Sequence, residues 1–163
     1  MAFQKTVLVL GALLFTAPVE AADRFEELYC LAKNIYFESR NQPKLGQIAV
    51  AQVTMNRVNS PKFPDSVCGV VQQGGEKRHR CQFSWYCDGK KDEPEGDAAW
   101  DESVYLALLI YSEEFAIDVT EGALWYHATY VSPNWAEHYE KTVRINEHIF
   151  YSCLLYTSPS PRD

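Results

Sequence analysis

Apolar residues recur at helical spacing along much of the chain. In the first such stretch, Leu28, Leu31 and Ile35 share one face of a segment that Asp23 could cap. Similar stripes follow, and turn-rich segments separate them. Four helices are therefore predicted, at residues 23–40, 44–58, 66–71 and 97–115.

The pattern changes in the last third of the chain. Residues 122–127 and 142–151 read as β segments, with Asn146-Glu147 as a turn or bulge in the second. We expect the two β segments to pair antiparallel. Between the helical stretches, residues 74–96 show no sustained period and carry several aromatic residues, which is typical of a functional loop.

One carboxylate stands at the end of the first predicted helix. Pro43 disfavours the helical conformation at the residue before it, so this helix should stop near Asn41, with Glu38 in its last turn. The carbonyl end of a helix carries partial negative charge, which favours a raised pKa for the Glu38 carboxyl. A glycosidase needs such a protonated acid to donate a proton to the leaving oxygen. The alternative is a solvated glutamate paired with Arg40 or a lysine.

The two ends of the chain differ from its middle. Residues 1–21 combine Lys5, a short apolar run and small residues before Ala21, which predicts a cleaved export signal and a place in the periplasm or elsewhere in the cell envelope. The alternative is an uncleaved anchor, although the run is shorter than the roughly 20 residues of a membrane span. Residues 22–151 should form one domain. Residues 152–163 read as a disordered tail or a sequence scar, and deleting 153–163 should leave the melting temperature unchanged.

Charge and cysteine content narrow the function classes. The formal net charge of −7 argues against nucleic acid as the main partner. Five cysteines in an exported chain indicate disulfides, and four of them allow three connectivities. A metal site from His79, Cys81, Cys87 and a further ligand is the alternative, but it lacks the paired spacing of structural zinc. The favoured disulfide pairs are Cys30–Cys68 and Cys81–Cys87.

Six short motifs occur in the same order as in a known family. They lie at residues 35–40, 46–58, 63–71, 81–85, 122–127 and 148–151. Together they resemble the cell wall hydrolases of the spore cortex-lytic type (SleB-like), including exported Gram-negative members. The resemblance spans about residues 28–151. At the end of the second helix, Asn56 and Arg57 could each face a substrate or cap the helix.

This resemblance implies a fold, a reaction and a set of site residues. The implied fold is α+β, a mostly helical lysozyme/lytic-transglycosylase-like domain with a small antiparallel β element. The implied reaction is cleavage of the β-1,4 bond between N-acetylmuramic acid and N-acetylglucosamine in peptidoglycan, with Glu38 as catalytic acid and no cofactor or metal. The implied substrate-binding residues are Ser39, Gln82, Ser84, Tyr126 and His127. Many members carry Ala at the position of Ser39.

The number of carboxylates bears on the mechanism. A lytic transglycosylase needs one carboxyl group, which serves first as acid and then as base. A two-carboxylate muramidase-type hydrolase needs a second, and Glu76, Asp88 and Asp92 are only weak candidates. The sequence therefore favours a lytic transglycosylase. It also leaves open a non-catalytic peptidoglycan-binding module, a structural protein of the envelope and a zinc amidase.

Overall fold

The structure is a computed structural model that describes residues 17–76, 80–112, 114–115 and 117–153, with side chains from residue 22 onward. The expected export signal lies outside the described residues except for the backbone of residues 17–21. Residues 154–163 of the expected tail also lie outside them.

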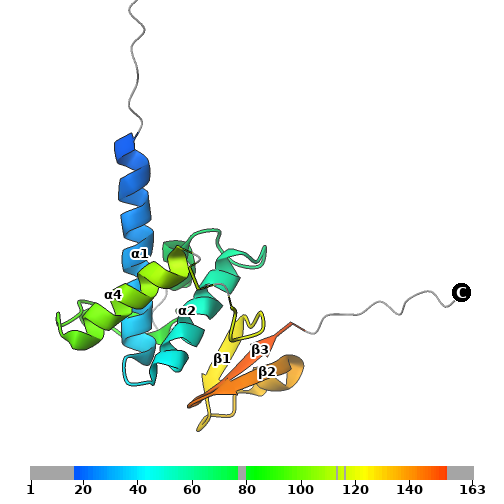
Figure 1. Ribbon diagram of the computed structural model, residues 1–163. Helices are drawn as coiled ribbons and strands as arrows, with labels where there is room; N and C mark the ends of the chain where they lie inside the picture. Colours follow the sequence, from blue (N-terminus) through cyan, green and yellow to red (C-terminus); the bar gives the residue numbers. More distant parts are fainter. Residues whose placement is uncertain (1–16, 77–79, 113, 116, 154–163) are drawn as a thin grey trace, which may run out of the picture.

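A long first helix organises the fold. α1 (Ala17–Ser39) rises beyond the body of the molecule, and α2 (Lys44–Val58) and α4 (Ala98–Tyr111) pack against its lower half (Figure 1). The short α3 (Val67–Val71) also packs on α1. Within the described residues no helix is both long and apolar enough to cross a membrane.

The helix starts follow N-cap chemistry in part. The sequence predicts Asp97 as the cap of α4 and either Asp65 or Ser66 as the cap of α3. Asp97 Oδ1 accepts a 2.9 Å hydrogen bond from the Trp100 amide, and Ser66 Oγ accepts one of 3.1 Å from the Gly69 amide, so Asp97 is confirmed and Ser66 is the cap of α3. The N-cap predicted at Asp23 is wrong, because α1 runs continuously through it. Alanine and glutamate residues favour helix before Asp23, and a proline is tolerated in a first helical turn.

The β element has three strands instead of the two segments predicted. β1 (Trp125–Ala128), β2 (Glu140–Ile145) and β3 (His148–Ser152) form an antiparallel sheet in the order β1-β3-β2. The expected turn splits the second segment in two, because Asn146 adopts a positive φ of 52° that reverses the chain. β3 therefore lies in the centre, and its last residue is the first residue of the predicted tail.

Helix α2 stands between the helices and the sheet. Its residues Ile48 and Ala51 belong to the larger hydrophobic cluster with α1, α3 and α4, whereas Ala49 and Val53 join a smaller cluster against the sheet. Helical spacing predicts Trp100, Val104, Leu108 and Tyr111 as the core face of α4. Three of them pack against the larger cluster, but Leu108 is 49% exposed. The buried residues of α4 are Ser103, Leu106, Ala107 and Ile110.

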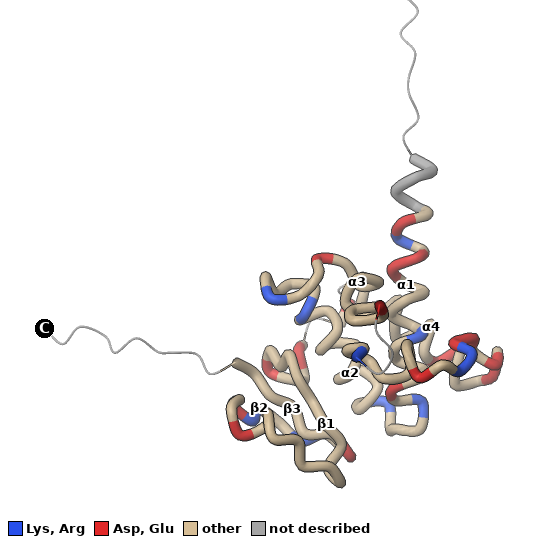
Figure 2. Tube along the Cα trace, turned by 180° about the vertical axis from the view of Figure 1, so that it is seen from behind, with Lys and Arg blue, Asp and Glu red and all other residues tan. Residues whose placement is uncertain are grey.

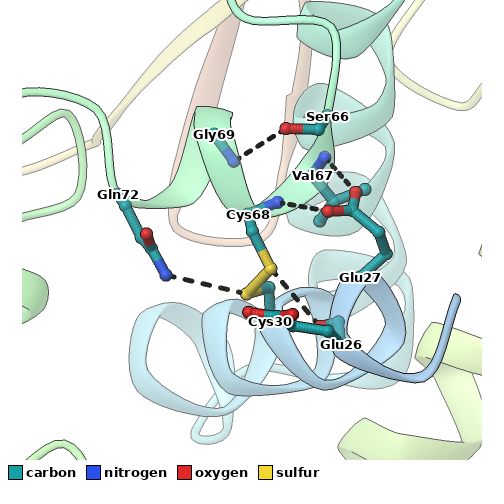
Figure 3. The surroundings of a disulfide bond; sticks show 8 residues. All are labelled: Glu26, Glu27, Cys30, Ser66, Val67, Cys68, Gly69 and Gln72. Atoms are coloured by element: carbon teal, nitrogen blue, oxygen red, sulfur yellow. Dashed lines mark hydrogen bonds between the residues drawn. A yellow bond between two sulfur atoms is a disulfide. The ribbon is translucent and has the colours of Figure 1, made fainter. Parts of the chain in front are cut away.

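Two disulfides stabilise the described part of the chain, one between two helices and one within a loop. Cys30 on α1 bonds Cys68 on α3, and beside this bond the Glu27 carboxylate accepts from the backbone amides of Val67 and Cys68 (Figure 3). The second disulfide, Cys81–Cys87, closes a short loop. These are the two pairs that the sequence favoured, and Cys153 is free.

Lysine and arginine positions are scattered over the coloured trace and form no single basic face in this view (Figure 2).

Candidate active site

Glu38 lies in a small polar pocket where α1, α2, β1 and the disulfide-closed loop meet. The pocket has a volume of about 180 Å³. Its lining residues are Glu38, Arg57, Cys81, Gln82, Phe83, Ser84 and Tyr126. Four segments that are distant in sequence therefore converge on one carboxyl group.

The side chain of Tyr126 holds the carboxyl of Glu38. Its hydroxyl donates a 2.9 Å hydrogen bond to Glu38 Oε2. The ring of Tyr126 packs edge-on against His148 at 5.2 Å between centroids and lies 5.6 Å from Phe150. Because these contacts come from the central strand, the sheet fixes the direction from which Tyr126 reaches the end of α1.

Burial sets the protonation of this pair. It raises the pKa of Glu38, and the hydrogen bond from Tyr126 and the positive charge of Arg57 oppose part of that rise. Burial also raises the pKa of Tyr126 well above its ordinary value, and the neighbouring Glu38 adds to the effect. Tyr126 thus stays protonated and remains a donor at neutral pH. The direction expected for Glu38 agrees, although burial and not the helix end is the first cause.

Arg57 also lines the pocket, although its sequence position predicted only that it faces a substrate or caps the end of the second helix. It is 2% exposed, and its Nε donates a 2.8 Å hydrogen bond to the carbonyl oxygen of Leu124. Its guanidinium lies 5.1 Å from the ring centre of Phe83 and 5.3 Å from that of Phe63. Burial lowers its pKa to about 10, so Arg57 stays charged at neutral pH. Its place in the 46–58 motif was the only signal in the sequence.

The disulfide-closed loop carries two of the expected site residues into the pocket. Gln82 and Ser84 are exposed and line the pocket, while their neighbours Phe83 and Trp85 are buried. Trp85 Nε1 donates a 3.0 Å hydrogen bond to Asn34 Oδ1 on α1. Because Phe83 and Trp85 are buried, the polar residues that alternate with them, Gln82 and Ser84, face the pocket.

Two other expected site residues do not line the pocket. Ser39 is fully buried, and its Oγ donates a 2.9 Å hydrogen bond to the carbonyl oxygen of Ile35 on the same helix. His127 stacks on Tyr151 at 5.3 Å between ring centres, and its Nε2 lies 2.9 Å from the Tyr151 hydroxyl. Successive residues of a strand point to opposite faces, so His127 points away from the pocket that Tyr126 enters.

Glu38 is the only carboxylate among the described residues that line this pocket. The three weak candidates for a second carboxylate, Glu76, Asp88 and Asp92, do not line it. In the part of the chain that the structure describes, no three or more His, Cys, Asp or Glu side chains are grouped to hold a metal ion. Of the candidate zinc ligands, Cys81 and Cys87 are bonded to each other, and His79 lies outside the described residues.

A sequence model of the Cell Wall Hydrolase family matches residues 41–151. The chain belongs to the cell wall hydrolase family. This confirms the resemblance inferred from the motifs. Glu38 lies just before the matched segment, so its assignment rests on the geometry of the pocket and on the first motif.

Curated relatives cover different shares of the chain. The spore cortex-lytic enzyme of Bacillus subtilis (strain 168) is 34% identical over 126 residues, which are 76% of this chain and 37% of the relative. The spore cortex-lytic enzyme of Halalkalibacterium halodurans is 49% identical over 45 residues, which are 28% of this chain and 14% of the relative. The chain therefore spans well under half the length of these curated relatives.

Solved structures agree with the fold. The catalytic domain of the Bacillus cereus SleB protein matches with a TM-score of 0.59 and 28% identity, covering 78% of this chain and 91% of that domain. The catalytic domain of the germination-specific lytic transglycosylase SleB from Bacillus anthracis matches with a TM-score of 0.60 and 29% identity, covering 77% and 93%. The expected fold class, a mostly helical lysozyme-like domain with a small antiparallel β element, is confirmed.

Proposed function

We propose that the protein degrades peptidoglycan as a lytic transglycosylase that cleaves the β-1,4 bond between N-acetylmuramic acid and N-acetylglucosamine. The observation that carries this proposal is one partly buried carboxyl, Glu38, with a raised pKa in a polar pocket of a cell wall hydrolase fold. The Bacillus anthracis neighbour is a germination-specific lytic transglycosylase, which supports the reaction type.

The proposed reaction uses Glu38 twice. The protonated carboxyl gives its proton to the glycosidic oxygen while the bond from that oxygen to C1 of the muramic acid breaks. The resulting carboxylate then takes the proton of the muramic acid O6 hydroxyl as O6 bonds to C1. The product carries a 1,6-anhydro ring, no water is consumed, and Glu38 ends protonated.

The neighbours of Glu38 have separate proposed roles. Tyr126 fixes one carboxyl oxygen through its 2.9 Å hydrogen bond and so orients the other toward the reacting bond. Gln82 and Ser84 line the pocket from the disulfide-closed loop and offer hydrogen bonds to a sugar. Under this proposal the protein is exported and acts in the periplasm or elsewhere in the cell envelope.

The test is digestion of purified peptidoglycan by the full chain, followed by mass spectrometry of the soluble fragments. Fragments ending in 1,6-anhydro-muramic acid, lighter by one water than the hydrated sugar, are expected. Reducing-end fragments would instead establish hydrolysis, which needs a second carboxylate or a held water. Binding without fragments would establish the peptidoglycan-binding module.

The matched control is Glu38→Gln, which keeps the shape of the side chain and its capacity to accept from Tyr126. We expect this variant to be folded and inactive. Turnover equal to that of the parent chain would end the assignment of Glu38, whatever fragments the parent releases.

A further inference from the structure

Arg57 is a buried cation with most of its donors unused. A guanidinium has five N–H donors and no acceptor. Among the described residues, the only hydrogen bond of this side chain joins Nε to the Leu124 carbonyl oxygen, and Nη1 is buried without a partner. Buried donors and buried charges are normally paired, because leaving them unpaired costs free energy. The described residues therefore leave N–H donors of this buried guanidinium free to bind a ligand.

No carboxylate of the described chain fills this role. Arg57 forms no ion pair with any described residue, and the nearby charge of Glu38 acts on it without direct contact. Both side chains nonetheless line the same pocket of about 180 Å³. The pocket therefore has space for a small substituent of a ligand, next to both the Glu38 carboxyl and the Arg57 guanidinium with its unused N–H donors.

The guanidinium is also held in place before any ligand arrives. The Leu124 carbonyl oxygen fixes Nε, and the rings of Phe63 and Phe83 lie within 5.3 Å of the guanidinium carbon. A charged donor that is already oriented loses little freedom when it binds an acceptor. This arrangement favours recognition over a purely structural role.

We propose that Arg57 is a substrate-binding residue whose guanidinium donates hydrogen bonds to an acyl oxygen of the glycan in the Glu38 pocket. The proposal deepens the proposed function and rests on it. An acyl oxygen only accepts, which suits a group that only donates, whereas a sugar hydroxyl also brings a proton that Arg57 cannot accept. In peptidoglycan such oxygens occur on the N-acetyl groups and on the lactyl group of muramic acid.

The test measures binding by calorimetry to the full chain carrying Glu38→Gln, so that no turnover interferes. The probes are an N-acetylglucosamine tetrasaccharide, a tetrasaccharide that contains muramic acid, and cellotetraose, which is neutral and has no acyl group. We expect Arg57→Met, added to Glu38→Gln, to weaken binding of an acylated probe by about tenfold or more. Cellotetraose should bind both chains equally weakly.

The two acyl sources give different patterns. Loss of affinity for both acylated probes assigns the acetamido oxygen, and loss for the muramic acid probe alone assigns the lactyl oxygen. Arg57→Lys should lose part of the affinity, because a single ammonium replaces a planar fork. Arg144→Met removes an exposed arginine on β2 and should change nothing. Equal affinities with and without Arg57 for every acylated probe would overturn the proposal.

A second measurement needs no change at Arg57. In the Glu38→Gln chain, the guanidinium NMR signals of Arg57 should shift on addition of an acylated probe and stay fixed on addition of cellotetraose. Unmoved signals at saturating probe would overturn the proposal even if Arg57→Met fails to fold. Both measurements report binding and not turnover. Activity of the Glu38→Gln chain would therefore contradict the proposed function, whereas the role of Arg57 is decided by the binding results.

Discussion

Tyr126 and Glu38, 88 residues apart in sequence, are joined by a hydrogen bond of 2.9 Å between the phenol hydroxyl and Oε2. The bond connects the last turn of α1 to the first strand of the sheet. Since the phenol donates, it favours the ionised carboxylate, while burial favours the protonated acid. The balance of these two effects sets the pH range in which Glu38 is an acid.

Tyr126→Phe should therefore raise the pKa of Glu38 further. The proposed reaction needs protonated Glu38, so the alkaline fall of kcat/KM should move to higher pH. The pH dependence of peptidoglycan solubilisation measures this. Tyr151→Phe is the matched control, because its hydroxyl bonds His127 outside the pocket. An unchanged alkaline limb in the Tyr126 variant would mean that the hydrogen bond does not tune Glu38.

Glu38→Gln should stabilise the fold at neutral pH. Burial raises the pKa of Glu38, so between the unfolded and folded pKa values the folded chain binds more protons, and stability falls as pH rises through that window. Glutamine does not ionise and avoids this cost. Urea midpoints of variant and parent should differ at about pH 7 and converge at about pH 4 or below. Glu137→Gln is the control, because Glu137 is exposed, and its urea midpoint should show no such pH-dependent difference from the parent. A difference in urea midpoint for Glu38→Gln that persists in acid would contradict the explanation.

Removing the two disulfides should have different effects. Cys30 and Cys68 close a span of 38 residues, so Cys30→Ala with Cys68→Ala should cost about 3–4 kcal/mol of unfolding free energy. Cys81 and Cys87 close a span of 6, for which the same relation gives about 2 kcal/mol. Urea denaturation of both double variants checks the order. A reversed order would show that strain or residual structure, and not loop closure, dominates.

The second double variant should also lose activity beyond its loss of stability. Cys81 lines the pocket, and the loop that it closes carries Gln82 and Ser84. We expect peptidoglycan release by Cys81→Ala with Cys87→Ala to fall well below that of the other double variant at a temperature where both are folded. Equal rates would indicate that buried Phe83 and Trp85 hold the loop unaided.

Asp118→Asn should destabilise the segment of the chain that leads into β1. The Asp118 carboxylate accepts hydrogen bonds from Thr120, Gly122 and Asn56 at 2.7–3.0 Å. Burial alone would raise the pKa of Asp118, but these donors outweigh it and lower the pKa, so the contribution is present above the ordinary aspartate pKa and is lost as pH falls through the lowered value.

We expect Asp118→Asn to cost about 1 kcal/mol of unfolding free energy at neutral pH, given the partial exposure of the carboxylate. Denaturant unfolding at several pH values measures the cost, which should shrink in acid. Asp65→Asn is the control, because Asp65 is exposed and accepts no side-chain hydrogen bond from the described residues. A cost that is the same at every pH would assign the effect to geometry instead of charge.

Local patterns predicted more of this molecule than its long-range contacts. The span of α2 and the caps of α3 and α4 follow from periodicity and side-chain chemistry, and they are as expected. The predicted face of α4 is confirmed only in part, because Trp100, Val104 and Tyr111 pack partly buried against the helix cluster whereas Leu108 is half exposed. Periodicity defines a face without stating which neighbour covers it.

Prediction of the individual pocket residues from sequence was limited in the same way. Glu38 stood out because a carboxylate at a helix end is unusual, whereas Ser39 and His127 were expected in the site because the family resemblance implied them. Each of them directly follows a pocket residue, and adjacent residues point in different directions on a helix and on a strand, so neither Ser39 nor His127 lines the pocket. The position of Arg57 depends on contacts with Leu124 and Phe83, which no local pattern encodes.

The central place of β3 has a consequence for the newly made chain. Among the described residues, strand β1, which carries Tyr126, pairs only with β3, and β3 is the last element that the structure describes. When the ribosome has added Glu38 and Tyr126 to the chain, it has not yet added β3, the strand that holds the tyrosine in position. β1 is not stable at that point, because a single strand without its neighbour is not stable. Under the proposed function, activity should therefore arise only after synthesis has passed Ser152.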